Sequence, residues 1–219
     1  MQRLVLVHGA ATTAAVWDPL LPHLADLDVE VVAPERPRTG ELERELGWLA
    51  AHAEDAYVVG TSGGATLGLA LTATGASTAG LLLHEPAVGS LAPHLLDAVA
   101  VAFATGGRAA FGRLLYGPTW RPEMAGGVPE EVTAAELAMF RAFEPAPPTP
   151  GSGPVVVTFG ARSGPERRQA AEALGERLGH RVQEIPGAGH FAAHDAPAAF
   201  AAAVRSGLNL GRGHASAQA

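Results

Sequence analysis

Short, continuous runs of apolar residues alternate with longer amphipathic segments along most of the chain. Unbroken apolar runs of this length are typical of parallel strands that are covered on both faces. The predicted strands are Leu4–Val7, Val29–Val32, Tyr57–Val59, Leu81–Leu83, Val155–Phe159 and a weaker one at Arg181–Ile185. The helix-length segments between them are Ala14–Ala25, Glu41–His52, Ala65–Thr74, Pro165–Leu178 and Pro197–Gly207. This alternation predicts a doubly wound α/β fold with a mostly parallel, six-stranded sheet.

One region, residues 87–150, breaks the alternation because it contains no convincing strand. Its three helix-like segments are Leu91–Thr105, Arg108–Tyr116 and Pro129–Phe143, and a proline-rich stretch over 144–154 leads back to the next strand. We therefore expect a core formed by residues 1–86 and 151–207, with a helical lid inserted at 87–150. Residues 208–219 are expected to form a mobile tail.

Composition and charge narrow the class of protein further. The 219 residues are 47% apolar and 17% charged, which is typical of a folded domain. The net charge is −7 and the basic residues are scattered, so nucleic acid and anionic membranes are disfavoured as partners. The chain has no cysteine, which excludes disulfides, thiolate metal sites and a cysteine nucleophile. We expect a cytoplasmic protein with a small-molecule substrate, either a monomer or a homodimer.

A long uncharged stretch from Ala56 to Leu83 raises the question of a membrane helix. Glycines and hydroxyl residues recur throughout this stretch. A buried strand, a helix and a second strand account for it better than a membrane span does.

The segment Gly60-Thr61-Ser62-Gly63-Gly64 matches G-x-S-x-G between a predicted strand and a predicted helix. In this context the chain turns sharply, and the serine takes strained dihedral angles that expose its hydroxyl. The glycines are needed because strand and helix backbones pass close together there. The pattern predicts that Ser62 is a nucleophile, although a glycine-rich turn is the plainer explanation of the motif alone.

A serine nucleophile that attacks an acyl carbon needs two N–H donors for the oxyanion. One is expected from the amide of Gly63, where the following helix starts and its free N–H groups point outward. The other is expected from Ala10, in the loop after the strand that ends at His8-Gly9. His8 itself is expected to be a hydrogen-bonded structural histidine.

The general base is expected in the segment IPGAGHFAAHDAP, where His190 lies in a glycine-rich loop after the last strand. From there an imidazole can reach over the strand ends to Ser62. His194 is less well placed, because it lies beside the start of the final helix. Asp195 is expected to cap that helix, with Pro197 just inside it.

These features together resemble the α/β-hydrolase superfamily. His8-Gly9-Ala10, Gly60–Gly64 and Gly187–Phe191 are similar to its oxyanion loop, nucleophile elbow and histidine loop. The resemblance implies that the first strand of the chain corresponds to the family's third strand. The resemblance implies a serine esterase that needs neither a cofactor nor a metal ion. Dehalogenases and epoxide hydrolases of this superfamily carry Asp at the elbow, so Ser62 disfavours both.

The position of the third catalytic residue, the acid, departs from the common pattern. In most members the acid follows the strand after the insertion as G-x-x-D, but this chain has Gly160-Ala161-Arg162-Ser163 there. Certain haloalkane dehalogenases instead place a Glu after the preceding strand, which corresponds to Glu85. The resemblance therefore implies a Ser62–His190–Glu85 triad, in the family's usual chain order. His84 should point to the opposite side of the strand and be structural.

The expected function is cleavage of a carboxylic ester or thioester of a small apolar substrate through an acyl-enzyme. Candidate substrate-binding residues are Trp17, Phe103, Phe111, Trp120 and Phe140, with Leu95, Val99, Leu115 and Leu137 beside them, although most can equally pack the insertion onto the sheet. A non-catalytic small-molecule-binding protein is an alternative, favoured by the missing Asp at 163. A triad-based lyase is another, but a lyase of the hydroxynitrile type would recruit a lysine, and the chain has none.

Overall fold

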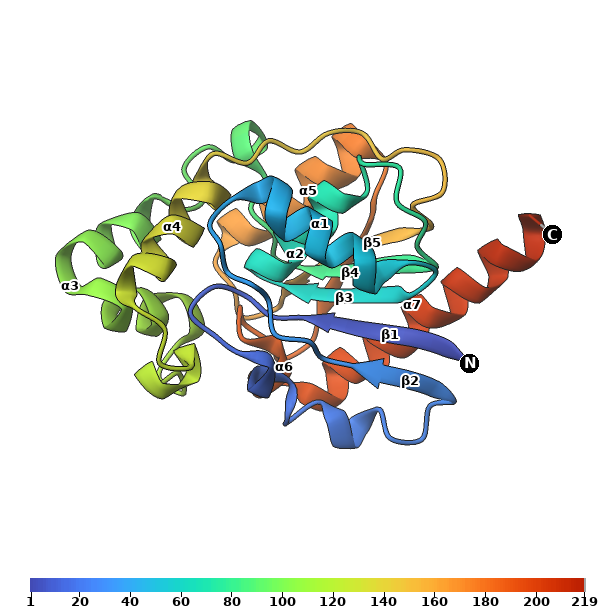
Figure 1. Ribbon diagram of the computed structural model, residues 1–219, viewed down its shortest axis with the longest axis horizontal. Coiled ribbons are helices and arrows are strands. Elements are labelled where there is room, and N and C mark those ends of the chain that lie inside the picture. The colour runs from blue at the N-terminus through green and yellow to red at the C-terminus, as the bar shows by residue number, and fades with distance from the viewer. Residues whose placement is uncertain (219) are drawn as a thin grey trace.

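The fold is built on one six-stranded sheet (Figure 1). The computed structural model describes the backbone of residues 1–218 and the side chains of residues 1–211. The strands are β1 (Gln2–Val7), β2 (Val29–Val32), β3 (Tyr57–Thr61), β4 (Gly80–His84), β5 (Val155–Gly160) and β6 (Arg181–Ile185). They lie in the order β2-β1-β3-β4-β5-β6, and every neighbouring pair is parallel. The predicted fold class is confirmed, and all six strands lie where the apolar runs placed them.

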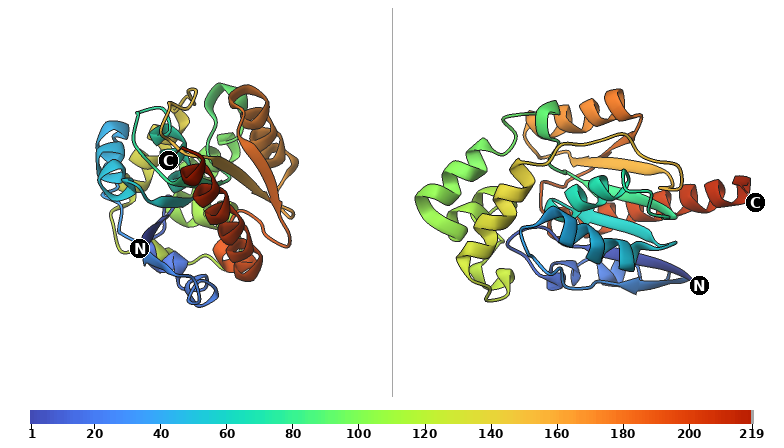
Figure 2. Two further views of the ribbon diagram at one scale, coloured as in Figure 1. Left: turned by 90° about the vertical axis from the view of Figure 1, so that its right-hand side faces the viewer. Right: turned by 45° about the horizontal axis from the view of Figure 1, so that its top comes forward.

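Helices cover both faces of the sheet (Figures 1 and 2). One face carries α1 (Leu42–Ala53), α2 (Gly63–Leu71) and α5 (Pro165–Leu178), and the other carries α6 (Ala192–Asp195), α7 (Pro197–Gln218) and the 3-10 turns η1 (Ala14–Trp17) and η2 (Leu21–His23). The single helix expected over Ala14–Ala25 is therefore wrong. Pro19 and Pro22 explain the two short turns, because proline donates no backbone hydrogen bond and clashes within an α-helix.

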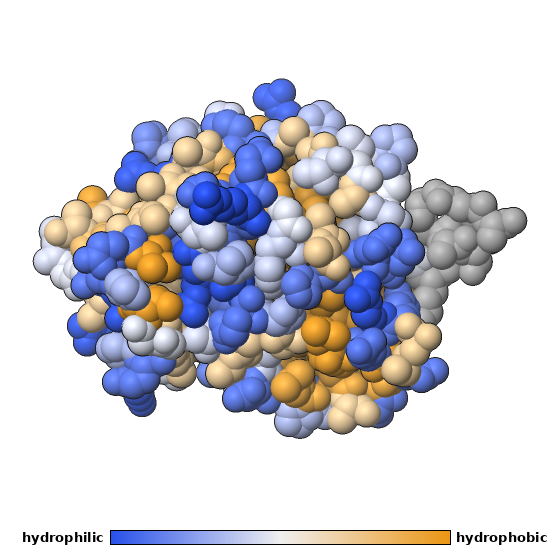
Figure 3. Space-filling model, viewed as in Figure 1, coloured by the Kyte–Doolittle hydropathy of each residue, from blue (hydrophilic) through white to orange (hydrophobic). Residues whose placement is uncertain are grey.

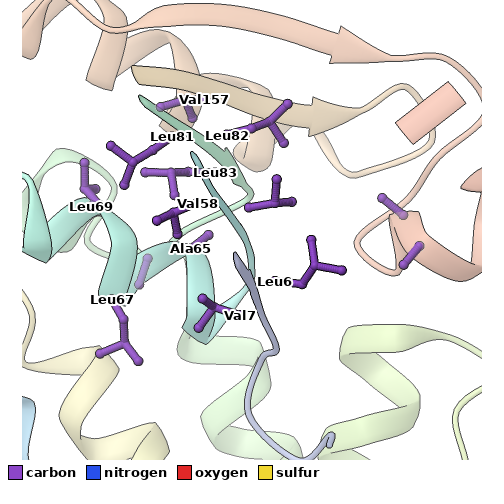
Figure 4. Packing of buried hydrophobic residues seen from close by; sticks show 14 of the residues in the cluster. Leu6, Val7, Val58, Ala65, Leu67, Leu69, Leu81, Leu82, Leu83 and Val157 are labelled. Atoms are coloured by element: carbon purple, nitrogen blue, oxygen red, sulfur yellow. The ribbon is translucent and has the colours of Figure 1, made fainter. Parts of the chain in front are cut away.

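The apolar core lies on both sides of the central strands (Figure 4). Leu81 and Leu83 of β4 point toward α2, where a Cβ added to Gly68 would lie 2.5 Å from Leu83 Cδ2. Leu82 points to the opposite face, and all three leucines are fully buried. Burial on both faces accounts for the unbroken apolar run of this strand.

The segment between β4 and β5 contains four helical elements and, within the described residues, no strand. These are η3 (Gly89–Leu91), α3 (Asp97–Tyr116), η4 (Pro122–Ala125) and α4 (Glu130–Arg141). We call residues 87–150 the lid segment. Its helices lie beyond the end of the sheet toward which the strand arrows point (Figure 1). Helix α3 is interrupted at Gly106 and Gly107, where two separate helices were predicted, because Gly107 takes a φ of 59°.

The final helix is longer than the sequence pattern indicates. Helix α7 continues beyond Gly207 to Gln218, so most of the predicted tail is helical. The side chains after residue 211 and the whole of residue 219 lie outside the described part of the chain. Gly207 allows close packing rather than ending the helix, since a Cβ there would lie 1.9 Å from the Tyr57 hydroxyl. A Cβ added to Gly211 would similarly lie 2.5 Å from the Ala79 carbonyl oxygen.

The surface in Figure 3 is mostly polar, with apolar side chains gathered over the edge strand β2 and its neighbour β1. Among the described residues, no helix combines the length and the apolar content needed to cross a bilayer.

Candidate active site

Ser62 forms a sharp turn between β3 and α2. Its φ of 53° and ψ of −120° lie outside the regions favoured by residues with a side chain. The flanking glycines make this turn possible, because a Cβ on Gly60 would lie 2.6 Å from the Gly64 carbonyl oxygen. A Cβ on Gly64 would lie 2.1 Å from the Val7 carbonyl oxygen. The G-x-S-x-G motif therefore has the strained strand–turn–helix geometry that the sequence predicted.

Two backbone amides converge beside Ser62. The amide of Gly63 is the first of helix α2, so it has no partner within the helix. The amide nitrogen of Ala10 lies close by, 3.3 Å from the position that a Cβ on Gly63 would occupy. The two predicted oxyanion donors, Ala10 and Gly63, thus border the same small space next to the serine.

The loop that carries Ala10 is held from within. Nδ1 of His8 and the hydroxyl of Thr12 both donate to the Gly9 carbonyl oxygen, at 3.0 and 2.9 Å. That carbonyl shares a peptide unit with the Ala10 N–H, so these bonds fix the direction of the N–H. Nε2 of His8 accepts a bond from the Arg36 amide at 3.2 Å. His8 is fully buried and satisfied on both nitrogens, as expected for a structural histidine.

Two aromatic side chains of the lid segment hold the same loop from outside. The Tyr116 hydroxyl donates to the Ala10 carbonyl oxygen at 2.6 Å, and Trp120 Nε1 donates to the Ala11 carbonyl oxygen at 3.0 Å. Ala11 takes a φ of 52°, a strained value for alanine. Tyr116 was not among the predicted site residues, and Trp120 was predicted to bind the substrate. Trp120 instead packs against Gly112 and supports the loop.

Glu85 ends β4 and binds the imidazole of His190, whose Nδ1 donates to Glu85 Oε2 at 2.7 Å. The other carboxylate oxygen accepts bonds from the Gly160 amide, at 2.9 Å, and from the Ser163 hydroxyl. Ser163, at the position where the sequence pattern G-x-x-D would place an acid, therefore donates to the Glu85 carboxylate. Burial would raise the pKa of Glu85, but the His190 hydrogen bond and the nearby charge of Arg167 hold that pKa well below its usual range. The carboxylate stays ionised.

The imidazole of His190 is oriented and kept neutral by its surroundings. Because Nδ1 carries the proton donated to Glu85, Nε2 is the unprotonated nitrogen of the neutral ring. Nε2 is buried and has no hydrogen-bond partner among the described residues. The Tyr116 ring lies 5.5 Å from the imidazole, centroid to centroid. Burial first, and the charge of Arg167 second, lower the pKa of His190 to about 4. His190 therefore has a free basic nitrogen at neutral pH.

The loop that carries His190 is fixed by two residues with predicted structural roles. His84 is fully buried, accepts a bond from the Thr158 hydroxyl at Nδ1 and donates from Nε2 to the Gly189 carbonyl oxygen, each at 3.0 Å. Asp195 accepts a bond from the Gly189 amide at 2.9 Å. The expectation that Asp195 caps the final helix is wrong in this respect: Asp195 is the last residue of α6, and its carboxylate turns back to the histidine loop.

Two hollows meet at these residues. A small cavity with about 30 Å³ of free space is lined by Ser62 and Gly63, and a larger groove of about 660 Å³ is lined by His190. Both are also lined by Glu85 and Arg167.

Of the predicted substrate-binding residues, two line the small cavity and three do not. Phe111 and Phe140 line it, and the Phe140 ring lies directly over Gly63, 2.5 Å from the position of an added Cβ. Phe103 packs edge-on against Phe111, with centroids 6.2 Å apart, behind the cavity wall. Trp17 is fully buried and stacks on Phe200 at 6.4 Å, so it belongs to the core. The prediction that Trp17 and Trp120 bind the substrate is therefore wrong.

A buried ionic cluster attaches the lid segment to the core, and the sequence analysis did not identify it. Arg36 donates to Glu136 of α4, to Glu45 of α1 at 3.2 Å and to the His8 carbonyl oxygen at 3.1 Å. All three charged side chains are buried. The guanidinium also lies 5.7 Å from the centroid of Phe140. The helix that carries Phe140 is therefore attached to the end of the strand that leads into the Ala10 loop.

Comparisons with known proteins agree with this architecture. A structure of an enol-lactonase from Burkholderia xenovorans LB400 aligns with a TM-score of 0.73 at 20% identity, covering 95% of this chain and 91% of that one. NosK from Streptomyces actuosus aligns with a TM-score of 0.72 at 20% identity, covering 96% and 99%. Naproxen esterase (carboxylesterase NP) from Bacillus subtilis aligns with a TM-score of 0.63 at 16% identity, covering 94% and 82%.

At these identities the structural likeness establishes the fold. A comparison with curated protein sequences gives no significant match. A sequence profile described as the alpha/beta hydrolase family matches residues 4–203, which is most of the chain. The chain therefore belongs to the alpha/beta hydrolase family.

Proposed function

We propose that the protein is a serine hydrolase that cleaves a carboxylic ester or thioester of a small substrate through an acyl-enzyme. The observation that carries the proposal is the proton arrangement around His190. Its Nδ1–H is donated to Glu85, which leaves Nε2 as a buried base without a partner among the described residues. A base in this state is what a neighbouring serine hydroxyl needs in order to attack.

The proposed reaction uses five groups. Ser62 Oγ attacks the acyl carbon while His190 Nε2 takes its proton, and Glu85 stabilises the imidazolium that forms. The amides of Ala10 and Gly63 donate to the oxyanion of the tetrahedral intermediate. His190 then gives the proton to the leaving group. A water molecule activated by the same imidazole hydrolyses the acyl-enzyme and restores the serine.

The strained conformation of Ser62 favours catalysis over simple binding. Backbone strain of this kind is typical of functional sites, and a binding protein needs neither a serine with φ of 53° nor a buried imidazole nitrogen that has no partner among the described residues. Ester cleavage is also compatible with the names of two proteins of similar fold, an enol-lactonase and a carboxylesterase. The chain has no lysine, which disfavours a lyase of the hydroxynitrile type.

Hydrolysis of p-nitrophenyl acetate and butyrate tests the proposal. We expect a burst of p-nitrophenol followed by steady turnover, and we expect Ser62→Ala to lose both with a nearly unchanged melting temperature. Ser77→Ala is the matched control, because Ser77 is an exposed serine before β4, at the opposite end of the sheet. Equal turnover by Ser62→Ala and the native protein would refute the proposed mechanism, and no turnover by either would favour a binding protein.

A further inference from the structure

Arg167 is a buried cation that faces both hollows of the candidate active site. It lies in the first turn of α5, and only 8% of its surface is exposed. The side chain lines the small cavity together with Ser62, and it also lines the larger groove together with His190. A positive charge therefore lies where both hollows meet.

The contacts that Arg167 makes within the protein are few and long. Among the described residues, Glu85 is its one ion-pair partner, at 3.6 Å from Nε, and Nη1 lies 3.5 Å from the Glu85 backbone oxygen. Both distances exceed the 2.7–2.9 Å that is typical of charge-assisted hydrogen bonds. The Glu85 carboxylate is already bound by His190, Gly160 and Ser163. Glu85 thus has partners of its own without Arg167.

Arg36 in the same chain shows how a fully paired buried arginine is arranged. Its guanidinium contacts the carboxylates of Glu45 and Glu136 and one backbone carbonyl. These two acids outweigh the effect of burial and raise the pKa of Arg36, whereas burial lowers the pKa of Arg167. Leaving a buried charge poorly paired is costly, so a position such as that of Arg167 calls for a further anionic partner.

We propose that Arg167 determines specificity by binding a carboxylate on the acyl group of the substrate. This inference rests on the proposed hydrolase function and names the substrate class. Arg167 shares the small cavity with Ser62, so the carboxylate lies a few bonds from the scissile carbonyl. The planar guanidinium fork matches a carboxylate in a bidentate manner. Asp195 and Glu166 also line the groove, which favours a singly charged group over a phosphate.

A pair of esters of matched chain length tests the proposal. The charged ester is p-nitrophenyl hemiglutarate, and the neutral one is p-nitrophenyl pentanoate. We expect the native protein to show a kcat/KM for the charged ester about tenfold or more above that for the neutral ester, as a charge-assisted bidentate pair warrants. The neutral ester is the internal reference for each variant, so a loss that affects both substrates cancels in the ratio.

Arg167→Gln should lower this ratio by about tenfold or more, and Arg167→Lys should lower it less because it keeps the charge without the fork. Arg168→Gln is the matched control, since Arg168 is the next residue of α5, is exposed, lines neither hollow and pairs with Glu184 at 2.8 Å. Its ratio should stay within about twofold of the native value. An equal fall of both rates in Arg167→Gln would overturn the proposal, because it would show that Arg167 only supports Glu85.

Binding of glutarate separates this inference from the proposed function. We expect Ser62→Ala to bind glutarate in calorimetry, and the same variant with Arg167→Gln or Arg167→Lys to bind it more weakly. Melting curves identify any variant that fails to fold. If Arg167→Gln does not fold, glutarate binding by Arg167→Lys tests the proposal in its place. If neither ester is cleaved, the hydrolase proposal fails while glutarate binding still tests Arg167. Equal glutarate affinity with and without Arg167 would refute the carboxylate site.

Discussion

The Glu85 carboxylate accepts a 2.7 Å hydrogen bond from Nδ1 of His190, although the two residues are 105 positions apart in the sequence. Strand β5 lies between the strands that lead to them, so the histidine loop must reach back across one strand. Glu85 makes this contact from a turn with φ of 51°, a strained value that directs the side chain over the strand ends. Two residues of the proposed triad, Ser62 and Glu85, thus have strained backbone conformations.

Replacing Glu85 by Gln should lower kcat by about 10⁴, because the imidazole loses both its fixed tautomer and the charge that stabilises its protonated form. Substrate affinity should change little. The measurement is turnover of a p-nitrophenyl ester under saturating conditions.

Asp195→Asn is the control for the loss of a carboxylate near His190. Asparagine keeps an oxygen that can accept the Gly189 amide, so we expect a loss of about tenfold or less, consistent with one weakened hydrogen bond. Near-native turnover by Glu85→Gln would show that the enzyme works as a Ser–His dyad or with another acid.

The pH dependence should reflect the buried state of His190. The imidazole acts as a base only when neutral, so kcat/KM should rise with pH through the pKa of His190, about 4, and reach a plateau by neutral pH. The same shift predicts a change in stability. The unfolded chain takes up the proton at about pH 6.5, so the contribution of His190 to stability falls as the pH drops from about 6.5 to 4. An acid limb at pH 6.5 or above would contradict this account.

The lid segment should contribute to catalysis through the oxyanion loop. Trp120→Phe and Tyr116→Phe each remove one donor to a carbonyl of the Ala10–Ala11 segment. Each lost bond is worth about 0.5–1.5 kcal/mol, so we expect kcat to fall by up to about tenfold while KM stays nearly constant.

Phe103→Leu is the control, because Phe103 packs beside the cavity and holds no loop carbonyl. Steady-state kinetics and melting curves distinguish a loss of kcat from a loss of stability. A lower melting temperature with kcat intact in both phenylalanine variants would mean that Tyr116 and Trp120 only stabilise the fold.

Acyl-chain selectivity should depend on Phe140. The cavity beside Ser62 offers only about 30 Å³, and Phe140 lies over Gly63, so short acyl groups are expected to be preferred among neutral esters. Phe140→Ala should move the preference toward longer chains, by about 1–3 kcal/mol for each methylene that the enlarged pocket accepts. The measurement is a series of p-nitrophenyl esters from acetate to octanoate, with Phe103→Ala as the control. An identical length profile in Phe140→Ala and the native protein would show that the acyl group binds elsewhere.

The strands and the elbow could be predicted because their signals are local. A buried parallel strand must be apolar on both faces, and the Ser62 turn needs glycine at fixed positions. Glu85 was predicted from the resemblance to dehalogenases that carry a Glu after this strand, not from a local pattern of its own. The break at Gly106–Gly107 was likewise visible, whereas Gly207 misled because a glycine needed for close packing resembles a helix stop.

Contacts between distant segments left no such signal. Arg36 and Glu136 are 100 positions apart, and Glu136 belongs to a helix whose sequence resembles an exposed one. Core residues and pocket residues are both often aromatic, so the sequence does not distinguish the roles of Trp17 and Trp120. The packing shows that Trp17 stacks on Phe200 and that Trp120 donates to a loop carbonyl. The hydrogen bonds from the lid segment to the Ala10–Ala11 loop likewise form only because the lid segment folds back over the end of the sheet.

The most direct test of the central claim is labelling with a fluorophosphonate probe, followed by identification of the modified residue by mass spectrometry. The probe reacts with a serine only where a base and oxyanion donors activate it. We predict a single adduct on Ser62, absent from Ser62→Ala and retained in Ser163→Ala. Labelling of Ser163 or another serine, or no labelling of the folded native protein, would contradict the assignment of Ser62 as the nucleophile.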